Sequence, residues 1–297
     1  MKTIIFSVFI SLLLNSCFAQ SIPFDSLYLG QEPPVNNPKK FNLSASQGYH
    51  AIERIEISND GKSIFYHENN GYDSNSNGRL KYYVYENNKW TGPFVLYEDA
   101  GPLALSITGD TIYYTHDGFV WYSMKNNSGW TEPIKFSTKI PFWHYLQVTN
   151  SGTFYAAMKT AKDKIGSIDW SKILINHSDT SIISLGSPIN TTKDNLDFYI
   201  SKDESYIIFS SDHAAAIKYG YSDLYISFRK NDNTWTNPKN LGNIINNAAE
   251  ARWGVYVSPD NKYLFYSHGS KPDYSDSGTN WVRIDNVTDS LKKICLK

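Results

Sequence analysis

Cysteine is almost absent from this chain of 297 residues, which contains only Cys17 and Cys295. Cys17 lies in an N-terminal segment that export would remove or lipidate, so no disulfide is expected within the mature chain. Cys295 is expected to be an ordinary small residue on a last strand. Methionine is also scarce (3), whereas Tyr (22) and Phe (15) are abundant. Because aromatic side chains suit the half-buried surface of a sheet, the composition favours strands over helices.

The chain also lacks an excess of positive or negative charge, and it lacks the motifs of several enzyme classes. Lys and Arg (28) nearly balance Asp and Glu (29), and no segment is a run of Lys and Arg, so nucleic acid is not an expected partner. The chain has no G-x-S-x-G elbow, no Walker or dinucleotide glycine pattern, and no CxxC or HExxH zinc pair. We therefore predict no catalytic residue of these classes and no cofactor, with calcium as the one weak candidate.

The apolar run at residues 4–14 is too short to span a bilayer comfortably, so no transmembrane span is predicted. It follows Lys2 and precedes small or polar residues up to Ala19, a pattern typical of a signal peptide over residues 1–19. Two processing routes remain open. Cleavage after Ala19 would give a soluble periplasmic or extracellular protein. Alternatively, Leu14-Asn15-Ser16-Cys17 resembles a lipobox, and Cys17 would then be lipidated and hold the protein at the outer membrane.

A motif of Trp, Thr, any residue and Pro occurs three times, at the end of aromatic-rich units of roughly 40 to 57 residues. The copies begin at Trp90, Trp130 and Trp235. Because Pro has no N–H to donate, this strand should lie at the outer edge of each sheet, with its Trp packed between neighbouring sheets. A repeat of this length indicates an array of small sheets.

A second repeated feature is a polar hairpin turn that precedes an aromatic strand. Its five copies begin at Ser58, Thr108, Thr149, Ser201 and Ser258. With two further strands in each unit, this pattern predicts an all-β fold, a β-propeller of five four-stranded blades. Six blades remain possible if one unit is degenerate.

The two ends of the chain predict how the ring closes. The last unit lacks the Trp motif, whereas Asn37-Pro38-Lys39-Lys40-Phe41 parallels Asn237-Pro238-Lys239-Asn240-Leu241 of the fourth unit. We therefore expect the N-terminal segment to supply the outer strand of the last blade, which leaves few unpaired edges. Residues 20–36 are expected to be extended, and residues 37–297 to form the propeller domain.

Three segments resemble a known family. They are Tyr28-Leu29-Gly30-Gln31-Glu32-Pro33-Pro34, residues 221–229 and residues 258–265. They look like segments of exported TolB-like, WD-repeat-like β-propellers of Bacteroidetes-type bacteria. The resemblance implies a propeller in or beyond the periplasm, and it implies no particular catalytic residue.

The segment Asp73-Ser74-Asn75-Ser76-Asn77-Gly78 fits the first half of an EF-hand-like loop. Asp73, Asn75 and Asn77 are therefore weak calcium-ligand candidates. The twelfth loop position is Val84, where a bidentate Glu is required, so a polar hairpin loop is the favoured interpretation.

Candidate ligand-binding residues are expected just before the inner strands, whose entering loops crowd one mouth of the channel. They are Glu53, Arg54, Trp143, His144, Asp197, Glu250, Arg252 and Trp253. Carboxylates, guanidinium groups and aromatic faces can hold a sugar or a peptide in a concave site. The alternative is structural, because polar groups near a propeller axis also satisfy strand ends and channel water.

Three functions follow from this pattern. The leading hypothesis is a monomeric, non-catalytic exported propeller that binds an envelope protein, a peptide or a cell-envelope glycan at the channel mouth. A second is a carbohydrate-active hydrolase or lyase that uses Glu53, Asp197 or Glu250 as an acid–base pair. A third is a structural module for envelope assembly.

Overall fold

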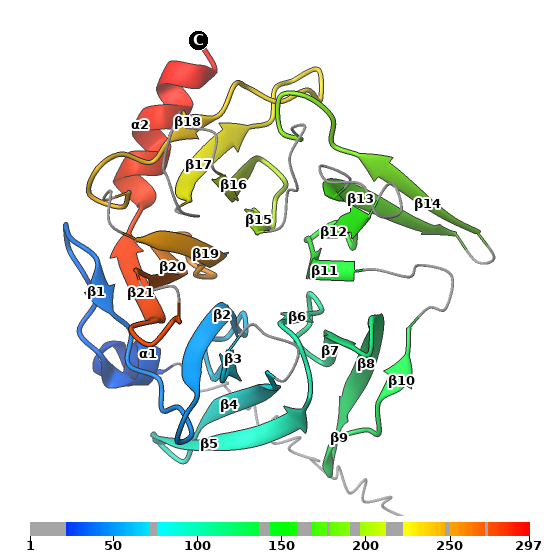
Figure 1. Cartoon of the computed structure of the whole chain (residues 1–297), viewed down its shortest axis with the longest axis vertical. Helices are drawn as coiled ribbons and strands as arrows, with labels where there is room; N and C mark the ends of the chain where they lie inside the picture. Colours follow the sequence, from blue (N-terminus) through cyan, green and yellow to red (C-terminus); the bar gives the residue numbers. More distant parts are fainter. Residues whose placement is uncertain are drawn as a thin grey trace, which may run out of the picture.

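The computed structural model describes residues 22–71, 76–136, 143–159, 168–176, 179–190, 197–211, 222–246, 250–270 and 273–297. Within this part of the chain, five antiparallel sheets stand around a common axis as the blades of a β-propeller (Figure 1). The predicted fold class and blade number are confirmed.

Four blades follow one another along the chain, each running from the axis outward. Blade one is β2 (His50–Ile57), β3 (Ser63–Asn69), β4 (Gly78–Glu86) and β5 (Lys89–Glu98). Blade two is β6 (Leu103–Leu105), β7 (Thr111–His116) and β8 (Phe119–Asn126), with β9 (Gly129–Trp130) and β10 (Ile134–Lys135) both paired to β8. Blade three is β11 (Trp143–Val148), β12 (Phe154–Lys159), β13 (Ile168–Asn176) and β14 (Asp179–Ser184). Blade four is β15 (Phe198–Ile200), β16 (Tyr206–Ser211), β17 (Asp223–Phe228) and β18 (Lys239–Asn240).

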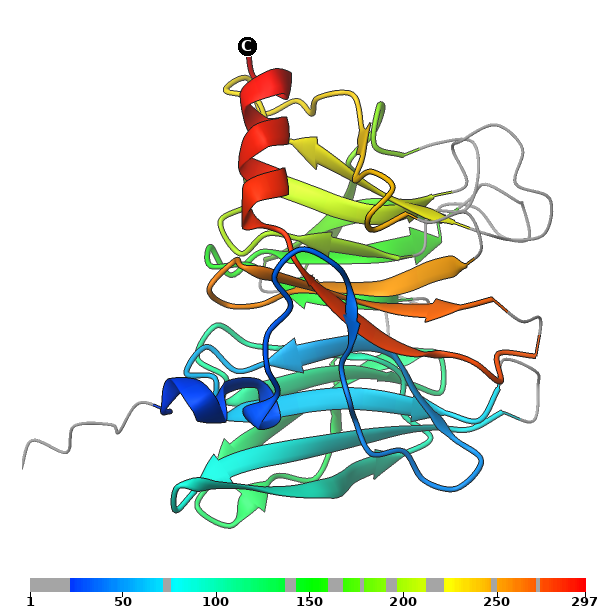
Figure 2. The same ribbon diagram turned by 90° about the vertical axis from the view of Figure 1, so that its left-hand side faces the viewer.

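Blade five joins the two ends of the chain. It consists of β19 (Ala251–Val257), β20 (Tyr263–Gly269), β21 (Gly278–Arg283) and the N-terminal strand β1 (Lys39–Lys40), which pairs antiparallel with β21. Figures 1 and 2 show β1 beside β21 at the outside of the ring. Next to this strand, Phe41 is 1% exposed and packs against Trp281 and Phe265. The predicted closure by the N-terminal segment is confirmed.

Three helical elements differ from the expectations. Phe24–Ser26 (η1) is a 3-10 turn, and Leu27–Gly30 (α1) is a turn with left-handed backbone at Tyr28 and Leu29, inside the segment expected to be extended. Cys295 ends the helix α2 (Asp285–Cys295) rather than lying on a last strand. In α2, Val287, Leu291 and Cys295 recur every fourth residue and pack against the core. An apolar stripe at this spacing favours a helix.

Two of the three repeated Trp side chains, Trp130 and Trp235, pack where blades meet, as predicted, whereas Trp90 contacts the N-terminal segment. Trp130 of blade two contacts Phe65 of blade one, with ring centroids 6.2 Å apart. Trp235 of blade four is 5% exposed and joins a cluster that includes Tyr155 of blade three. Trp90 donates from Nε1 to the Ser26 carbonyl at 2.7 Å. The motif therefore stabilises the scaffold and lies away from the axis.

Candidate functional site

Three of the five inner strands bulge toward the axis at matching positions. The bulges lie at Glu53 in β2, Tyr145 in β11 and Gly254 in β19, where the φ angles are 69°, 51° and 60°. Left-handed backbone is uncommon for Glu and Tyr and costs about 1–2 kcal/mol per residue. A bulge re-aims the side chain that it carries. Here, the bulges direct Glu53 and Tyr145 toward each other.

Gly254 lets two blades approach closely at this level. A Cβ added to Gly254 would lie 2.5 Å from the Glu53 carbonyl carbon. Only glycine fits this position, because it combines positive φ with the contact. The Glu53 backbone therefore rests directly on blade five.

Glu53, Tyr145 and Asp197 form one hydrogen-bonded group. The Tyr145 hydroxyl donates to Glu53 Oε2, and it also bonds the carboxyl of Asp197. Burial, followed by the neighbouring Glu53 carboxylate, raises the pKa of Asp197 to about 8, against the opposing effects of Tyr145 and the Gly254 N–H. The Tyr145 hydroxyl has a single proton, so it cannot donate to two ionised carboxylates at once. If Asp197 is protonated, Asp197 donates to the Tyr145 oxygen while Tyr145 donates to Glu53.

The axis is closed behind this group by side chains that join all five blades. Arg54 is 1% exposed and donates to the carbonyls of Leu103, Tyr145 and Leu146. Lys202 bonds Glu56 at 3.3 Å. The Tyr256 hydroxyl bonds both the N–H and the carbonyl of Ile57 at 3.1 Å. Among the described residues, these contacts join the inner strands on the side of Glu53 away from the mouth pocket.

A pocket of about 580 Å³ opens at the mouth, over blades one and two. Its lining residues come from the bulge of β2, from the loop before β6, and from the ends of β3 and β7. They are Glu53, His67, Asn69, Ser76, Asn77, Gly78, Asp99, Ala100, Gly101, Pro102, Thr115, His116 and Asp117. Three of these side chains are carboxylates, and none of the described lining residues is Lys or Arg.

His67 is the most buried polar side chain of this pocket, at 4% exposed. Burial lowers its pKa to about 4, although a hydrogen bond to the Ala100 carbonyl opposes the effect. Nδ1 has no partner in the described part of the chain, so the bond to the carbonyl comes from Nε2–H. The neutral ring therefore keeps one buried nitrogen, Nδ1, as an acceptor without a hydrogen-bond partner among the described residues.

The other candidates of the mouth form a separate network in blade five. Glu250 lies 3.7 Å from the guanidinium of Arg252 and 3.8 Å from His268. Arg252 is fully buried, and Trp253 is 9% exposed with its ring against Tyr274. The structure thus divides the predicted set. Glu53, Arg54 and Asp197 gather at the axis, whereas Glu250 pairs with Arg252 in blade five and Trp253 packs against Tyr274.

Several predictions fall outside the described part of the chain. The side chains of Trp143 and His144, at the start of β11, lie outside it, as do Asp73 and Asn75 of the calcium candidate. Asn77 is described, and it lines the mouth pocket. Among the described residues, no group of three or more His, Cys, Asp or Glu side chains is placed to hold a metal ion. No helix in the described residues is long and apolar enough to cross a bilayer.

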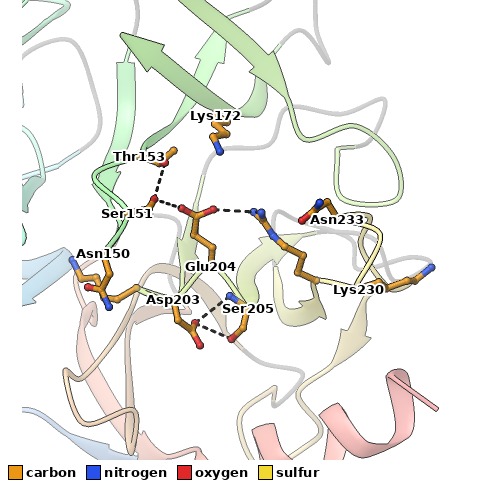
Figure 3. A pocket seen from close by; sticks show the side chains of 11 residues that line it. Asn150, Ser151, Thr153, Lys172, Asp203, Glu204, Ser205, Lys230 and Asn233 are labelled. Carbon is orange, nitrogen blue, oxygen red and sulfur yellow. Dashed lines mark hydrogen bonds and ion pairs between the residues drawn. The ribbon is translucent and has the colours of Figure 1, made fainter. Parts of the chain in front are cut away.

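A larger cavity, of about 730 Å³, lies on the opposite face at the seam of blades three and four (Figure 3). Its central carboxylate is Glu204, which accepts hydrogen bonds from Thr149, Ser151 and Tyr155 and pairs with Arg229 at 3.4 Å. Lys230 points away from Glu204 in this view. Because the Glu204 carboxylate is bonded to side chains of both blades, it joins them, and we assign this cavity a structural role.

Sequence reasoning missed Tyr145, Asp99 and Asp117. Tyr145 lies in a strand whose sequence has no unusual feature. The direction of its side chain depends on a β-bulge that the residue types around it do not indicate. The one sequence signal was Gly254, because a glycine inside a strand often marks a bulge or a close backbone approach. Asp99 and Asp117 belong to loops whose convergence depends on the stacking of two blades.

A scan against protein-family models finds no match, and a search of the curated proteins finds none either. Solved structures are similar at low identity. TolB from Acinetobacter baumannii is 11% identical over 80% of this chain with a TM-score of 0.48, and the match covers 55% of the TolB chain. A TolB from Agrobacterium tumefaciens is 15% identical over 78% of this chain and 77% of its own, with a TM-score of 0.48.

An enzyme is among the similar structures. The catalytic domain of the Coprinopsis cinerea GH62 α-L-arabinofuranosidase is 12% identical over 84% of this chain and 94% of its own, with a TM-score of 0.49. The likeness to all three proteins is too low to transfer an activity. The five-bladed fold is established by the strand pairing described above.

Proposed function

We propose that this chain is an exported, non-catalytic propeller that binds a polar ligand, either a peptide of an envelope protein or an envelope glycan, at the channel mouth. The observation that supports it is Glu53, a buried carboxylate held by Tyr145 at the base of the 580 Å³ mouth pocket. Two residues in left-handed backbone aim this group, and such strain is typical of functional sites. Export and the choice between cleavage after Ala19 and lipidation at Cys17 remain part of the proposal.

A glycan array and an envelope-peptide library tested with the mature protein check this proposal. Glu53→Gln keeps the side-chain size and removes the charge, and Glu132→Gln is the matched control on the exposed outer side of blade two. Losing a hydrogen bond to a charged group costs about 1.5–3 kcal/mol, so we expect affinity to fall at least tenfold in Glu53→Gln. The control should bind like the wild type. Equal binding by all three proteins would show that the ligand binds elsewhere.

A carbohydrate-active enzyme is the second candidate, favoured by the pair Glu53 and Asp197. The pKa of Asp197 is raised beside the Glu53 carboxylate, and a raised carboxyl next to a second carboxylate is a pattern found in general acid–base pairs. However, the Tyr145 hydroxyl bonds both groups and occupies the space between them, where the anomeric carbon of a sugar would have to lie. This geometry favours binding over hydrolysis.

Hydrolysis assays on aryl glycosides and envelope polysaccharides separate the two candidates. The binding function predicts no turnover by the wild type above that of a Glu53→Gln, Asp197→Asn double variant. Turnover that the wild type shows and the double variant loses would establish the enzyme instead.

A further inference from the structure

The described lining of the mouth pocket is rich in acidic side chains. Glu53, Asp99 and Asp117 contribute carboxylates. His116 lies with Nδ1 2.7 Å from the Asp99 carbonyl, which only accepts, so the ring donates there and leaves Nε2 as a further acceptor when neutral.

Positive charge of the protein stays outside this pocket. The nearest described guanidinium along the chain is Arg54, whose two terminal nitrogens donate to three carbonyls of blades two and three. His67 is neutral at physiological pH, because burial holds its pKa at about 4. The described lining thus has three acidic groups and no permanent cation.

We propose that the ligand of the mouth pocket carries a protonated primary amine, which lies against Glu53 with the rim carboxylates Asp99 and Asp117 around it. This inference rests on the proposed function. An ammonium group has three donors and no acceptor, so it matches a lining of carboxylates and imidazole nitrogen. Two sources share this chemistry: an amino sugar of a glycan, and a lysine side chain of a peptide.

Two pairs of probes, each differing only in acetylation of the amine, test the inference by isothermal titration. One pair is the glucosamine hexamer and the N-acetylglucosamine hexamer. The other is a Gly-Lys-Gly peptide with blocked ends and the same peptide with Nε-acetyl-lysine. We expect the free amine of at least one pair to bind at least tenfold more tightly than its acetylated partner. Which pair shows the difference identifies the source.

Variants assign that difference to the pocket. Glu53→Gln should remove most of the preference for the free amine, whereas Glu132→Gln should keep it. Because Glu53 is buried, a second variant, Asp99→Asn with Asp117→Asn, reports on exposed positions only. Both residues have φ of 50°, which Asn tolerates, so this variant should fold and lose a several-fold part of the preference.

The possible outcomes distinguish a failure of the amine inference from a failure of the proposed function. Equal affinity for free and acetylated probes, with loss of both in Glu53→Gln, would overturn the amine and keep the mouth as the binding site. An amine preference that survives both variants would place the ligand elsewhere and contradict both proposals. No binding of any free-amine probe would overturn the amine inference.

Discussion

At the scale of single residues, the molecule concentrates its unusual chemistry at Glu53, Tyr145 and Asp197. Two of them take left-handed backbone, and the third is a carboxyl whose pKa burial raises to about 8. The sequence alone identified both carboxylates, because charged residues beside inner strands are noticeable. It could not identify Tyr145, whose role depends on the direction of its side chain.

The raised pKa of Asp197 predicts a pH dependence of stability. An unfolded Asp has a pKa near 3.9, so between about pH 4 and pH 8 the folded state holds a proton that the unfolded state has lost. This contribution to stability is therefore complete below pH 4 and decreases as the pH rises to 8. Asp197→Asn mimics the protonated form and should lack this decrease.

Urea unfolding of wild type and Asp197→Asn at several pH values measures the effect. The free energy of unfolding of the variant, relative to wild type, should rise with pH by up to about 1.4 kcal/mol per pH unit in that window. A difference that does not change between pH 4 and pH 8 would mean that Asp197 is ionised in the folded protein.

At the scale of elements, the repeats in the sequence predicted the strands, their order and the outer position of the Trp motif. Turn residues and alternating aromatics are local signals, which is why they could be read directly. The bulges of β2, β11 and β19 are not local in this sense, because each depends on the neighbouring inner strand. The sequence did not predict the helix α2, because its apolar stripe can be recognised as a buried face only once the core that it packs against is known.

Gly254→Ala tests the close contact of β19 with β2. The new methyl would lie 2.5 Å from the Glu53 carbonyl carbon, so the variant should lose about 3 kcal/mol or more of stability and disturb Glu53. Gly242→Ala is the matched control, because Gly242 also has positive φ but no atom within 4 Å of the added Cβ. It should lose only about 1–2 kcal/mol in the same denaturant titration. Similar losses in both variants would show that φ alone matters.

At the scale of the whole molecule, the ring is closed by pairing β1 with β21. The prediction came from the likeness between residues 37–41 and 237–241, and the structure confirms it. The same ring brings loops of blades one and two together over Glu53. No single unit of the sequence contains that pocket, so its lining could not be assembled without the structure.

Phe41→Ala tests closure. This side chain is 1% exposed between Trp281 and Phe265, and its loss should cost about 3–5 kcal/mol of unfolding free energy. Phe24→Ala is the matched control, since Phe24 is 80% exposed and its removal should change stability by no more than about 0.5 kcal/mol. Thermal and urea unfolding measure both. A stable Phe41→Ala protein would mean that the ring does not depend on its N-terminal segment.

The proposed function requires that the ligand binds at the channel mouth. Hydrogen–deuterium exchange, with and without the tightest-binding probe from the array or library, tests it most directly. Binding at the mouth should slow exchange at residues 99–102 and 115–117, which line the mouth pocket, and leave residues 150–153 and 229–233 unchanged. Protection confined to residues 150–153 and 229–233 would place the ligand in the cavity of the opposite face and contradict binding at the mouth.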